Sequence, residues 1–144
     1  MHAFLDGRDT PPSSAQGFLR EFNAAIKDME NVKVVTLSGR FYAMDRDKRW
    51  DRVEQAYNNI VNASGKRYAS TDEAMGVSYA AGVTDEFVVP CVIGNYTGAA
   101  DGDAILMANF RADRAREILY ALADDKFEGF TRQKVIKFSI DVGM

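Results

Sequence analysis

Apolar residues recur along three stretches of the chain at the spacing of a helix that buries one face. The first helix is predicted after residue 12, the second from about Asp45, and the third where the arginines at 111–116 begin. Each is expected to pack one face on a sheet, and Trp50 is interpreted as a core residue because it heads its stripe. The stripes are Ala15, Phe18, Leu19, Phe22, Ile26 and Met29; Trp50, Val53, Tyr57, Ile60 and Val61; and Ala115, Ile118, Leu119 and Leu122.

Short runs of apolar and β-branched residues alternate with these helices and predict strands. The runs are 1–5, 32–37, 87–93, 104–108 and 135–140. Pro90 interrupts the third run, which indicates a sheet edge or a bend there. This alternation predicts an α/β fold in one domain, with a mixed, largely parallel sheet flanked by helices, and 104–108 as a buried strand.

Local signals indicate where the helices begin and end. Thr10 is a plausible N-cap for the first helix, with the prolines of 10–12 in its first turn. The second helix is expected to stop at Ser64–Gly65. Ser70–Glu73 is typical of a helix start, which predicts a further helix reaching Gly82.

Composition narrows the classes of function. The 144 residues carry a net charge of −3, which opposes bulk attraction to nucleic acid or an anionic membrane. Any anion must therefore bind to a local cluster. Eleven Arg against seven Lys mildly favour planar, two-pronged recognition of carboxylate or phosphate. The single cysteine, Cys91, and the lack of a signal peptide or long apolar segment predict a cytoplasmic protein.

Three of the predicted strands end in arginines. Arg8 follows the first strand, Arg40 and Arg46 the second, and Arg111 with Arg114 the strand at 104–108. In open α/β sheets ligands bind beyond the carboxyl ends of the strands, so we expect the three clusters to converge. Such a site suits a small, doubly anionic, hydroxylated molecule. The carboxylate beside Arg8, Asp9, could orient an arginine or take a proton from a hydroxyl.

Each cluster also has a purely structural interpretation. In the segment 38–50, Asp45 and Asp47 could neutralise the neighbouring cations in a solvated network without any ligand. The two arginines at the start of the third helix, three residues apart, could grip one anion together or be solvated beside nearby acids. Arg8 could belong to an ordinary Asp-Gly turn.

Other kinds of site find little support. No P-loop or G-x-G-x-x-G segment is present, His2 is the only histidine, and Cys91 has no evident base partner. The acidic loop residues are expected to be solvated, although they could in principle bind a hard cation. They are Asp101, Asp103, Asp124 and Asp125.

The segments at 2–12, 38–50 and 109–115 resemble three signature segments of the cofactor-independent (2,3-bisphosphoglycerate-independent) phosphoglycerate mutases. The segment at 85–90 is similar to another segment of that family. The resemblance covers nearly the whole chain, in the family's order and spacing.

The resemblance implies part of a two-domain isomerase that interconverts 3-phosphoglycerate and 2-phosphoglycerate in glycolysis and gluconeogenesis. In that family a phosphatase domain holds two metal ions, usually manganese, and a serine that becomes phosphoserine. The transferase domain holds the glycerate while it reorients. The resemblance implies Asp9 as a catalytic residue that positions or deprotonates a glycerate hydroxyl, and substrate binding by Arg8, Asp9, Arg40, Arg46, Arg111 and Arg114.

The chain also departs from the family pattern. The serine nucleophile, the Asp and His metal ligands, an upstream histidine segment and a downstream lysine have no counterpart in it. We therefore expect residues 1–144 to form a partial, truncated transferase domain that is inactive alone. Its partner would be the phosphatase domain of the same full-length chain, which would bind both manganese ions. Lys48, Arg49 and Arg52 are expected to be structural or solvated.

Two other functions stay open at this point. The chain could be a stand-alone binding module for a small phosphorylated carboxylate. It could also bind nucleic acid through 46–52, which its net charge opposes.

Overall fold

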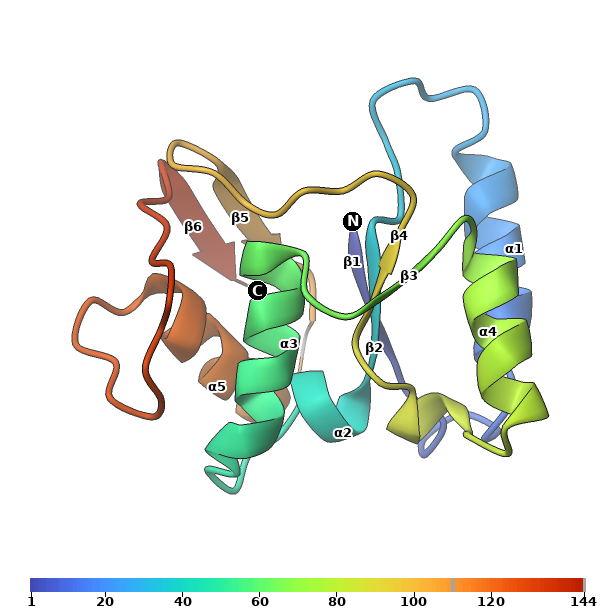
Figure 1. The fold of residues 1–144 in the computed structure, drawn as a ribbon, viewed down its shortest axis with the longest axis horizontal. Coiled ribbons are helices and arrows are strands. Elements are labelled where there is room, and N and C mark those ends of the chain that lie inside the picture. Colours follow the sequence, from blue (N-terminus) through green and yellow to red (C-terminus); the bar gives the residue numbers. More distant parts are fainter. Residues whose placement is uncertain (110, 144) are drawn as a thin grey trace.

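The computed structural model describes residues 1–109 and 111–143. A sheet with strand order β1-β2-β4-β3 forms the centre of the molecule (Figure 1). Strand β1 (His2–Leu5) pairs in parallel with β2 (Thr36–Gly39), and β2 pairs antiparallel with β4 (Cys91–Ile93). Strand β3 (Lys66–Tyr68) runs parallel to β4 at the other edge. The mixed, largely parallel sheet predicted from the sequence is confirmed.

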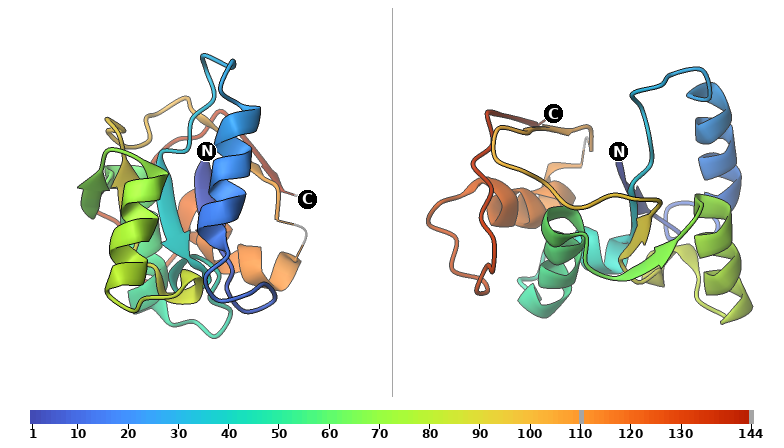
Figure 2. Two further views of the ribbon diagram at one scale, coloured as in Figure 1. Left: turned by 90° about the vertical axis from the view of Figure 1, so that its right-hand side faces the viewer. Right: turned by 45° about the horizontal axis from the view of Figure 1, so that its top comes forward.

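Helices lie on both sides of this sheet (Figures 1 and 2). Helix α1 (Ala15–Ala25) packs against α4 (Thr71–Ala80) on one side. Helix α3 (Trp50–Asn62) packs against α5 (Ala112–Ala123) on the other. No helix in the described part of the chain is long and apolar enough to cross a membrane.

Each pair of helices buries its own apolar cluster. The cluster beneath α1 and α4 includes Leu5, Leu19, Leu37, Met75, Val88 and Ile93. The cluster between α3 and α5 includes Val53, Tyr57, Val61, Ile118, Leu122 and Phe127. Most residues of the helical stripes therefore form the core as predicted, because residues three and four apart share a helix face. Phe18 and Met29 are exceptions: they are 55% and 54% exposed, and α1 ends before Met29. Trp50 packs at its rim, edge-on to Phe127 with ring centroids 5.2 Å apart.

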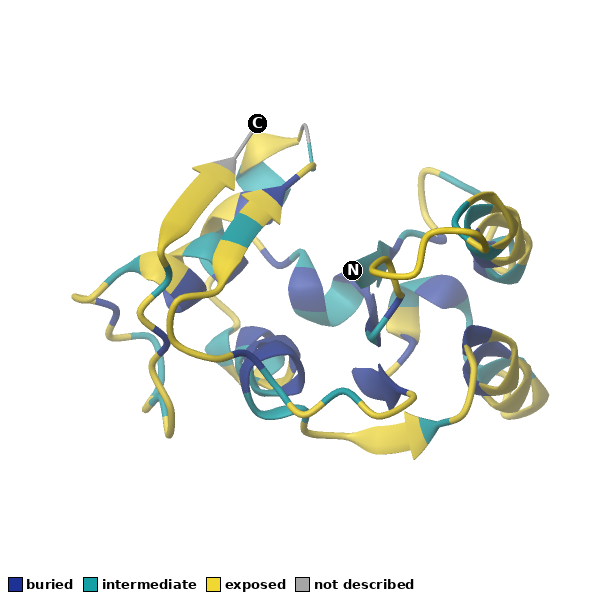
Figure 3. Cartoon of the chain, turned by 90° about the horizontal axis from the view of Figure 1, so that it is seen from above, coloured by how far each residue is buried: buried dark blue, intermediate teal, exposed yellow. Residues whose placement is uncertain are grey.

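Strands β5 (Ala104–Met107) and β6 (Ile140–Gly143) form a separate parallel pair. Seen from above, this pair is largely exposed, whereas α3 carries a buried face (Figure 3). Leu106 is 72% exposed and Ile140 is 60% exposed. The expectation of a buried strand at 104–108 is therefore wrong for most of its length, although Met107 reaches the core.

One helix start follows the sequence signal and another does not. The Ser70 hydroxyl accepts the backbone N–H of Glu73 at 3.1 Å, so the predicted start of α4 is confirmed. The N-cap of α1 is Ser14, and the Thr10 side chain instead accepts the N–H of Gly7 at 3.2 Å. Thr10 is thus a turn residue, and the N-cap prediction for it is wrong.

The segment after β2 differs most from its prediction. A single short helix, α2 (Arg40–Ala43), follows the strand at once, and α3 begins only at Trp50. The Asp45 carboxylate accepts the N–H groups of Asp47 at 3.0 Å and Arg49 at 2.9 Å. These bonds compete with the helical pattern, so a helix from Asp45 is wrong and 44–49 is a loop.

Two strands are displaced from their predicted positions. Strand β2 starts four residues after the predicted 32–37 run begins, and β6 starts at Ile140, the last residue of the 135–140 run. Before β4, the described chain forms a short 3-10 helix, η1 (Asp85–Phe87), where the strand at 87–93 was expected to start. Strand pairing, rather than β propensity alone, decides these limits.

Candidate functional site

The ends of β1 and β2 bring two of the predicted clusters together. Leu5 at the end of β1 is paired in register with Gly39 at the end of β2. The Asp6 carboxylate then accepts the N–H groups of Arg8 and Asp9, each at 3.2 Å. From this turn Asp9 reaches Arg40, at the start of the chain that leaves β2, while Arg8 lies near Glu86.

Arg40 is the most buried of the predicted site residues, with 4% of its surface exposed. Its guanidinium donates to Asp6 and, at 3.1 Å, to Asp9 Oδ2. Burial by itself lowers the pKa of Arg40, but the bonds to Asp6 and Asp9 outweigh it and raise that pKa. Arg40 therefore stays charged at the inner end of the site.

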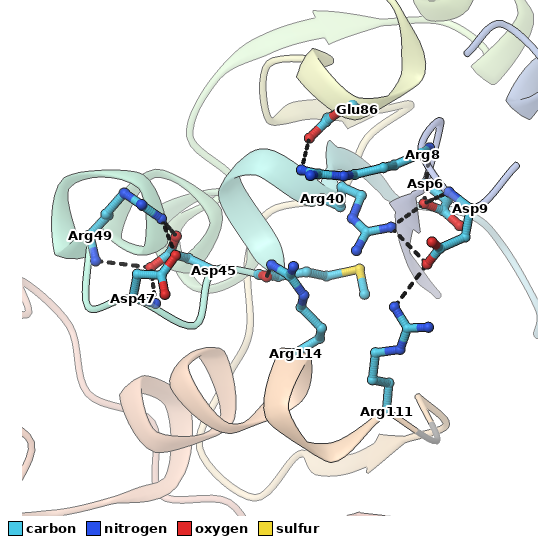
Figure 4. A network of polar contacts seen from close by, with 11 residues as sticks. Asp6, Arg8, Asp9, Arg40, Asp45, Asp47, Arg49, Glu86, Arg111 and Arg114 are labelled. Atoms are coloured by element: carbon cyan, nitrogen blue, oxygen red, sulfur yellow. Dashed lines mark hydrogen bonds and ion pairs between the residues drawn. The ribbon is translucent and has the colours of Figure 1, made fainter. Parts of the chain in front are cut away.

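Asp9 links the third cluster to the other two. Its Oδ2 atom accepts from Arg40 and also from Arg111 at 2.8 Å (Figure 4). The hydrogen bond from Arg40, followed by the charges of Arg111 and Arg40, lowers the pKa of Asp9 below its usual value. Three segments far apart in the sequence thus meet at one carboxylate. The predicted convergence is confirmed, but the strand before Arg111, β5, lies in a separate two-stranded sheet and not beside β1 and β2 as the strand-end argument assumed.

Arg46 and Arg114 lie on the other side of Arg40. Arg46 forms an exposed ion pair of 2.8 Å with Asp113. Arg114 donates to the carbonyl oxygen of Met44 at 3.0 Å, while its buried Nε atom has no partner among the described residues. Burial, followed by the charges of Arg46 and Arg40, lowers the pKa of Arg114. An unpaired buried donor beside other cations is a ready partner for an anion.

The cluster borders two cavities that share Arg40 and Met44. One, of about 920 Å³, lies between β1 and β5 and is mainly apolar, with Asp6, Asp9 and Arg111 among its polar lining residues. The other, of about 410 Å³, is lined by six arginines: Arg8, Arg40, Arg46, Arg49, Arg52 and Arg114.

The 410 Å³ cavity is rich in hydrogen-bond donors. Against its six arginines it has three acids, Asp45, Asp47 and Glu86. The Arg8 guanidinium lies 3.6 Å from Glu86, which is a loose ion pair. Arg52 stacks over the ring of Phe41 at 3.7 Å from the centroid. A doubly charged phosphoryl or carboxylate group would find planar donors on several sides of this cavity.

The structure separates the two arginines for which a shared anion or solvation beside nearby acids was left open. Arg111 turns toward Asp9 and the larger cavity, while Arg114 turns toward Met44 and the smaller one. Arg111 is the N-cap residue of α5, so it precedes the helix proper, and the helical spacing does not apply to it.

Sequence reasoning missed Asp6 and Glu117. Asp6 organises the turn and binds Arg40; its position two residues before Arg8 in an Asp-Gly turn was the available signal. Glu117 on α5 accepts the N–H of Lys48 at 2.9 Å, which ties the 44–49 loop to that helix. No sequence signal joined these two distant positions.

The acids of the 44–49 loop both pair with Arg49, but only one of them is solvated. Asp45 is 4% exposed and accepts the Arg49 guanidinium at 3.0 Å. Burial favours its neutral form, but the hydrogen bonds, above all from the N–H groups of Arg49 and Asp47, lower the pKa of Asp45. Burial raises the pKa of the neighbouring Glu117. The solvated alternative therefore fails for Asp45, while Asp47 is exposed and pairs with Arg49.

Beyond the arginines and Asp9, the described residues offer little for a metal site, a general base or a nucleophile. Across 1–109 and 111–143 no three His, Cys, Asp or Glu side chains form a group that could hold a metal ion. Burial lowers the pKa of His2 to about 4 and raises that of Cys91 to about 11. Neither side chain is poised as a base or nucleophile at neutral pH. Three of the acidic loop residues, Asp101, Asp103 and Asp124, accept backbone N–H groups, as Asp101 does from Lys137 at 2.9 Å.

Comparison with known proteins decides the family. The family model described as "BPG-independent PGAM N-terminus (iPGM_N)" matches residues 1–144. The chain belongs to this family. A 2,3-bisphosphoglycerate-independent phosphoglycerate mutase of Rhodopseudomonas palustris is 52% identical over the whole chain, and one of Roseobacter denitrificans is 46% identical. The chain spans 28% of the length of each of these relatives.

A solved structure supports the same assignment. The phosphoglycerate mutase of Leishmania mexicana, crystallised at low cobalt concentration, aligns with a TM-score of 0.91 at 31% identity. The alignment covers 99% of this chain and 28% of that one. The fold of the chain is thus that of one region of a larger mutase.

Proposed function

We propose that residues 1–144 are the substrate-binding part, a partial transferase domain, of a 2,3-bisphosphoglycerate-independent phosphoglycerate mutase. The full protein would be an isomerase that interconverts 3-phosphoglycerate and 2-phosphoglycerate in the cytoplasm. One observation carries the proposal: Asp9 joins Arg40 and Arg111 beside a cavity lined by six arginines. Family membership supports it.

In this proposal the arginines neutralise the two anionic groups of the substrate. Arg8, Arg46 and Arg114 have donors facing the 410 Å³ cavity, which suits the phosphoryl group or the carboxylate. Arg40 contributes to both cavities, and Arg111 holds Asp9 from the larger one. Arg40, which Asp6 and Asp9 hold in place, can stabilise charge without further reorganisation.

Asp9 is proposed to position a glycerate hydroxyl and accept its proton. Two guanidinium groups orient its carboxylate, and 54% of its side chain is exposed, so a ligand can reach it. The same cations lower the pKa of Asp9, which keeps it ionised at neutral pH and ready to accept a hydrogen bond.

Phosphoryl transfer requires groups that we assign to other parts of the full-length protein. The described residues offer no cluster that fits a metal ion, so the two manganese ions are assigned to the phosphatase domain. The serine that forms phosphoserine is assigned there as well. The chain's own part is to bind and orient the glycerate.

The test compares the full-length protein with the isolated chain in an enolase-coupled assay with manganese present. The full-length protein should convert 3-phosphoglycerate, and the isolated chain should show no turnover. Turnover by the chain alone would contradict the assignment of phosphoryl transfer to the phosphatase domain. No turnover by the full-length protein would contradict the proposed mutase function. Calorimetry on the isolated chain addresses the alternative, because tight binding of 3-phosphoglycerate would favour a stand-alone binding module.

A further inference from the structure

Asp85 is a fully buried carboxylate with no place in the proposed site. Its Oδ2 atom accepts the N–H groups of Ser14 at 2.9 Å and Ala15 at 2.8 Å. Its Oδ1 atom accepts the hydroxyl of Tyr79. Three donors on one carboxylate offset the cost of burying it.

These bonds tie three elements together. Ser14 makes no side-chain cap of its own, so Asp85 satisfies the N-terminus of α1 from a position 71 residues away. Tyr79 belongs to α4, and Asp85 itself begins η1. The N–H of Asp85 also donates to the carbonyl oxygen of Pro12 at 2.8 Å. η1 is thereby fixed to both helices on one side of the sheet.

η1 in turn lies directly against the two turns that carry site arginines. A Cβ atom added to Gly7 would lie 2.8 Å from both Asp85 Cβ and the nitrogen of Glu86. A Cβ added to Gly39 would collide with the carbonyl oxygen of Glu86. The N–H of Gly39 donates to the carbonyl oxygen of Val88 at 2.8 Å. Any shift of η1 would therefore move the turns that lead to Arg8 and Arg40.

η1 also supplies the acid that pairs with Arg8. Glu86 follows Asp85 directly, and its carboxylate lies 3.6 Å from the Arg8 guanidinium at the wall of the 410 Å³ cavity (Figure 4). The side chain of Arg8 is 66% exposed, so few other contacts fix its direction. The position of Glu86 is therefore a main influence on where Arg8 points.

We propose that Asp85 is a positioning residue for the substrate-binding cavity. It holds η1 against the two glycine turns, and through Glu86 it sets the direction of Arg8. This inference rests on the proposed function, since it concerns the site that binds the phosphoglycerate. It also assigns a role to the segment at 85–90, whose side chains outside Glu86 and Phe87 do not line that cavity.

The test uses the full-length protein with Asp85→Ala and Asp85→Asn. Asp85→Ala should raise the KM for 3-phosphoglycerate by about tenfold, with a smaller change in kcat, because a displaced Arg8 weakens binding. Asp85→Asn should restore most of the loss, since the amide oxygen can accept both N–H groups and the NH₂ can donate to Tyr79.

Asn59→Ala is the matched control for loss of a buried polar group. Asn59 is 1% exposed, lies on α3, and donates to the carbonyl oxygen of Ser64 at 2.7 Å. Its loss should lower the Tm but leave the KM within about twofold of the wild-type value. Equal increases in KM for Asn59→Ala and Asp85→Ala would show that Asp85 only stabilises the fold, which overturns the inference.

A double-mutant cycle with Arg8→Ala tests the route through Arg8. In the Arg8→Ala background, Asp85→Ala should raise the KM by less than about threefold, because the route through Glu86 and Arg8 is already lost and only the contact of η1 with Gly39 remains. Full additivity would overturn the inference. If Asp85→Ala does not fold, Tyr79→Phe removes one donor and should raise the KM about twofold to threefold; an unchanged KM would overturn the inference.

The same measurements separate this inference from the proposed function. Arg8→Ala with an unchanged KM would contradict the proposed site itself. Arg8→Ala with a raised KM, together with an unaffected Asp85→Ala variant, would leave the site standing and refute only the role of Asp85.

Discussion

The two sides of the arginine cluster differ in how their charges are satisfied. On the side of the 920 Å³ cavity, Asp6 and Asp9 bind the guanidinium groups of Arg40 and Arg111. On the side of the 410 Å³ cavity, the buried Nε of Arg114 has no partner within 1–109 and 111–143, and Arg8 is held by a loose ion pair. The first side is closed by its own carboxylates, while the second has donors left for a ligand. Counting arginines alone would not reveal this difference.

The difference indicates that the two sides of the arginine cluster have different roles in the site. A saturated cluster fixes geometry, because each member restrains the others, and so it suits the orientation of Asp9. A donor-rich cavity suits the binding of a mobile anion. Arg40 belongs to both sides, and substitutions on the two sides should therefore differ in size and kind.

The largest expected effect lies on the saturated side. In the full-length protein, Asp9→Asn should lower kcat by about 10²–10⁴-fold, the range of a lost acid–base group. Asn keeps one acceptor for the two arginines but cannot take a proton. Steady-state kinetics with 3-phosphoglycerate measures the effect. Asp113→Asn, which removes an exposed partner of Arg46, is the control and should change kcat little. A kcat above half of the wild-type value would remove Asp9 from catalysis.

Arg40 should rank next, because both cavities depend on it. Arg40→Ala should lower kcat/KM by about 10²–10³-fold, as expected for a preorganised donor to developing charge. The same assay on Arg40→Lys serves as the comparison. Nη1 of Arg40 alone donates to both Asp6 and Asp9, and Lys keeps the charge but lacks the further planar donors of the guanidinium, so only a minor recovery is expected. Full recovery by Lys would mean that charge alone matters, and the proposed difference between the two sides would be lost.

Arg46 and Arg52 test which arginines of the 410 Å³ cavity contact the ligand. Arg46→Ala should lower kcat/KM by about 10–100-fold, the value of one hydrogen bond to a charged group. Arg52→Ala should cost less than about threefold, since Arg52 stacks on Phe41 at 3.7 Å. Both are measured in the same coupled assay. Equal losses of kcat/KM would contradict the assignment of Arg46 as a ligand contact and of Arg52 as a supporting residue.

The smallest expected effect is a change in stability at Glu117, which holds the loop that carries Arg46. Burial raises the pKa of Glu117 in the folded chain, so its contribution to stability is present at low pH and is lost as the pH rises through that pKa. Glu117→Gln should therefore stabilise the chain at pH 7 and have little effect at pH 4. Urea unfolding at the two pH values measures this. A destabilised variant at pH 7 would show that Glu117 is ionised and needed as such.

Part of this site was predictable from the sequence, and the rest was not. The strand-end rule placed Arg8 and Arg40 correctly because β1 and β2 are parallel neighbours. The rule gave no reason to divide Arg111 from Arg114, since that depends on where α5 begins. The apolar pattern predicts a helix from about Asp45 where the structure has a loop, because a pattern of apolar residues does not show that the Asp45 carboxylate accepts backbone N–H groups.

The sequence by itself determined the alternation of strands and helices, the apolar faces that form the two clusters, and the arginines available for an anion. Those properties depend on spacing along the chain and on residue chemistry. Only the tertiary structure decided which carboxylates reach which arginines, and that Asp85 caps α1 from a distant segment. Such contacts join residues far apart in the sequence, so they follow from how the elements pack, and no local pattern specifies them.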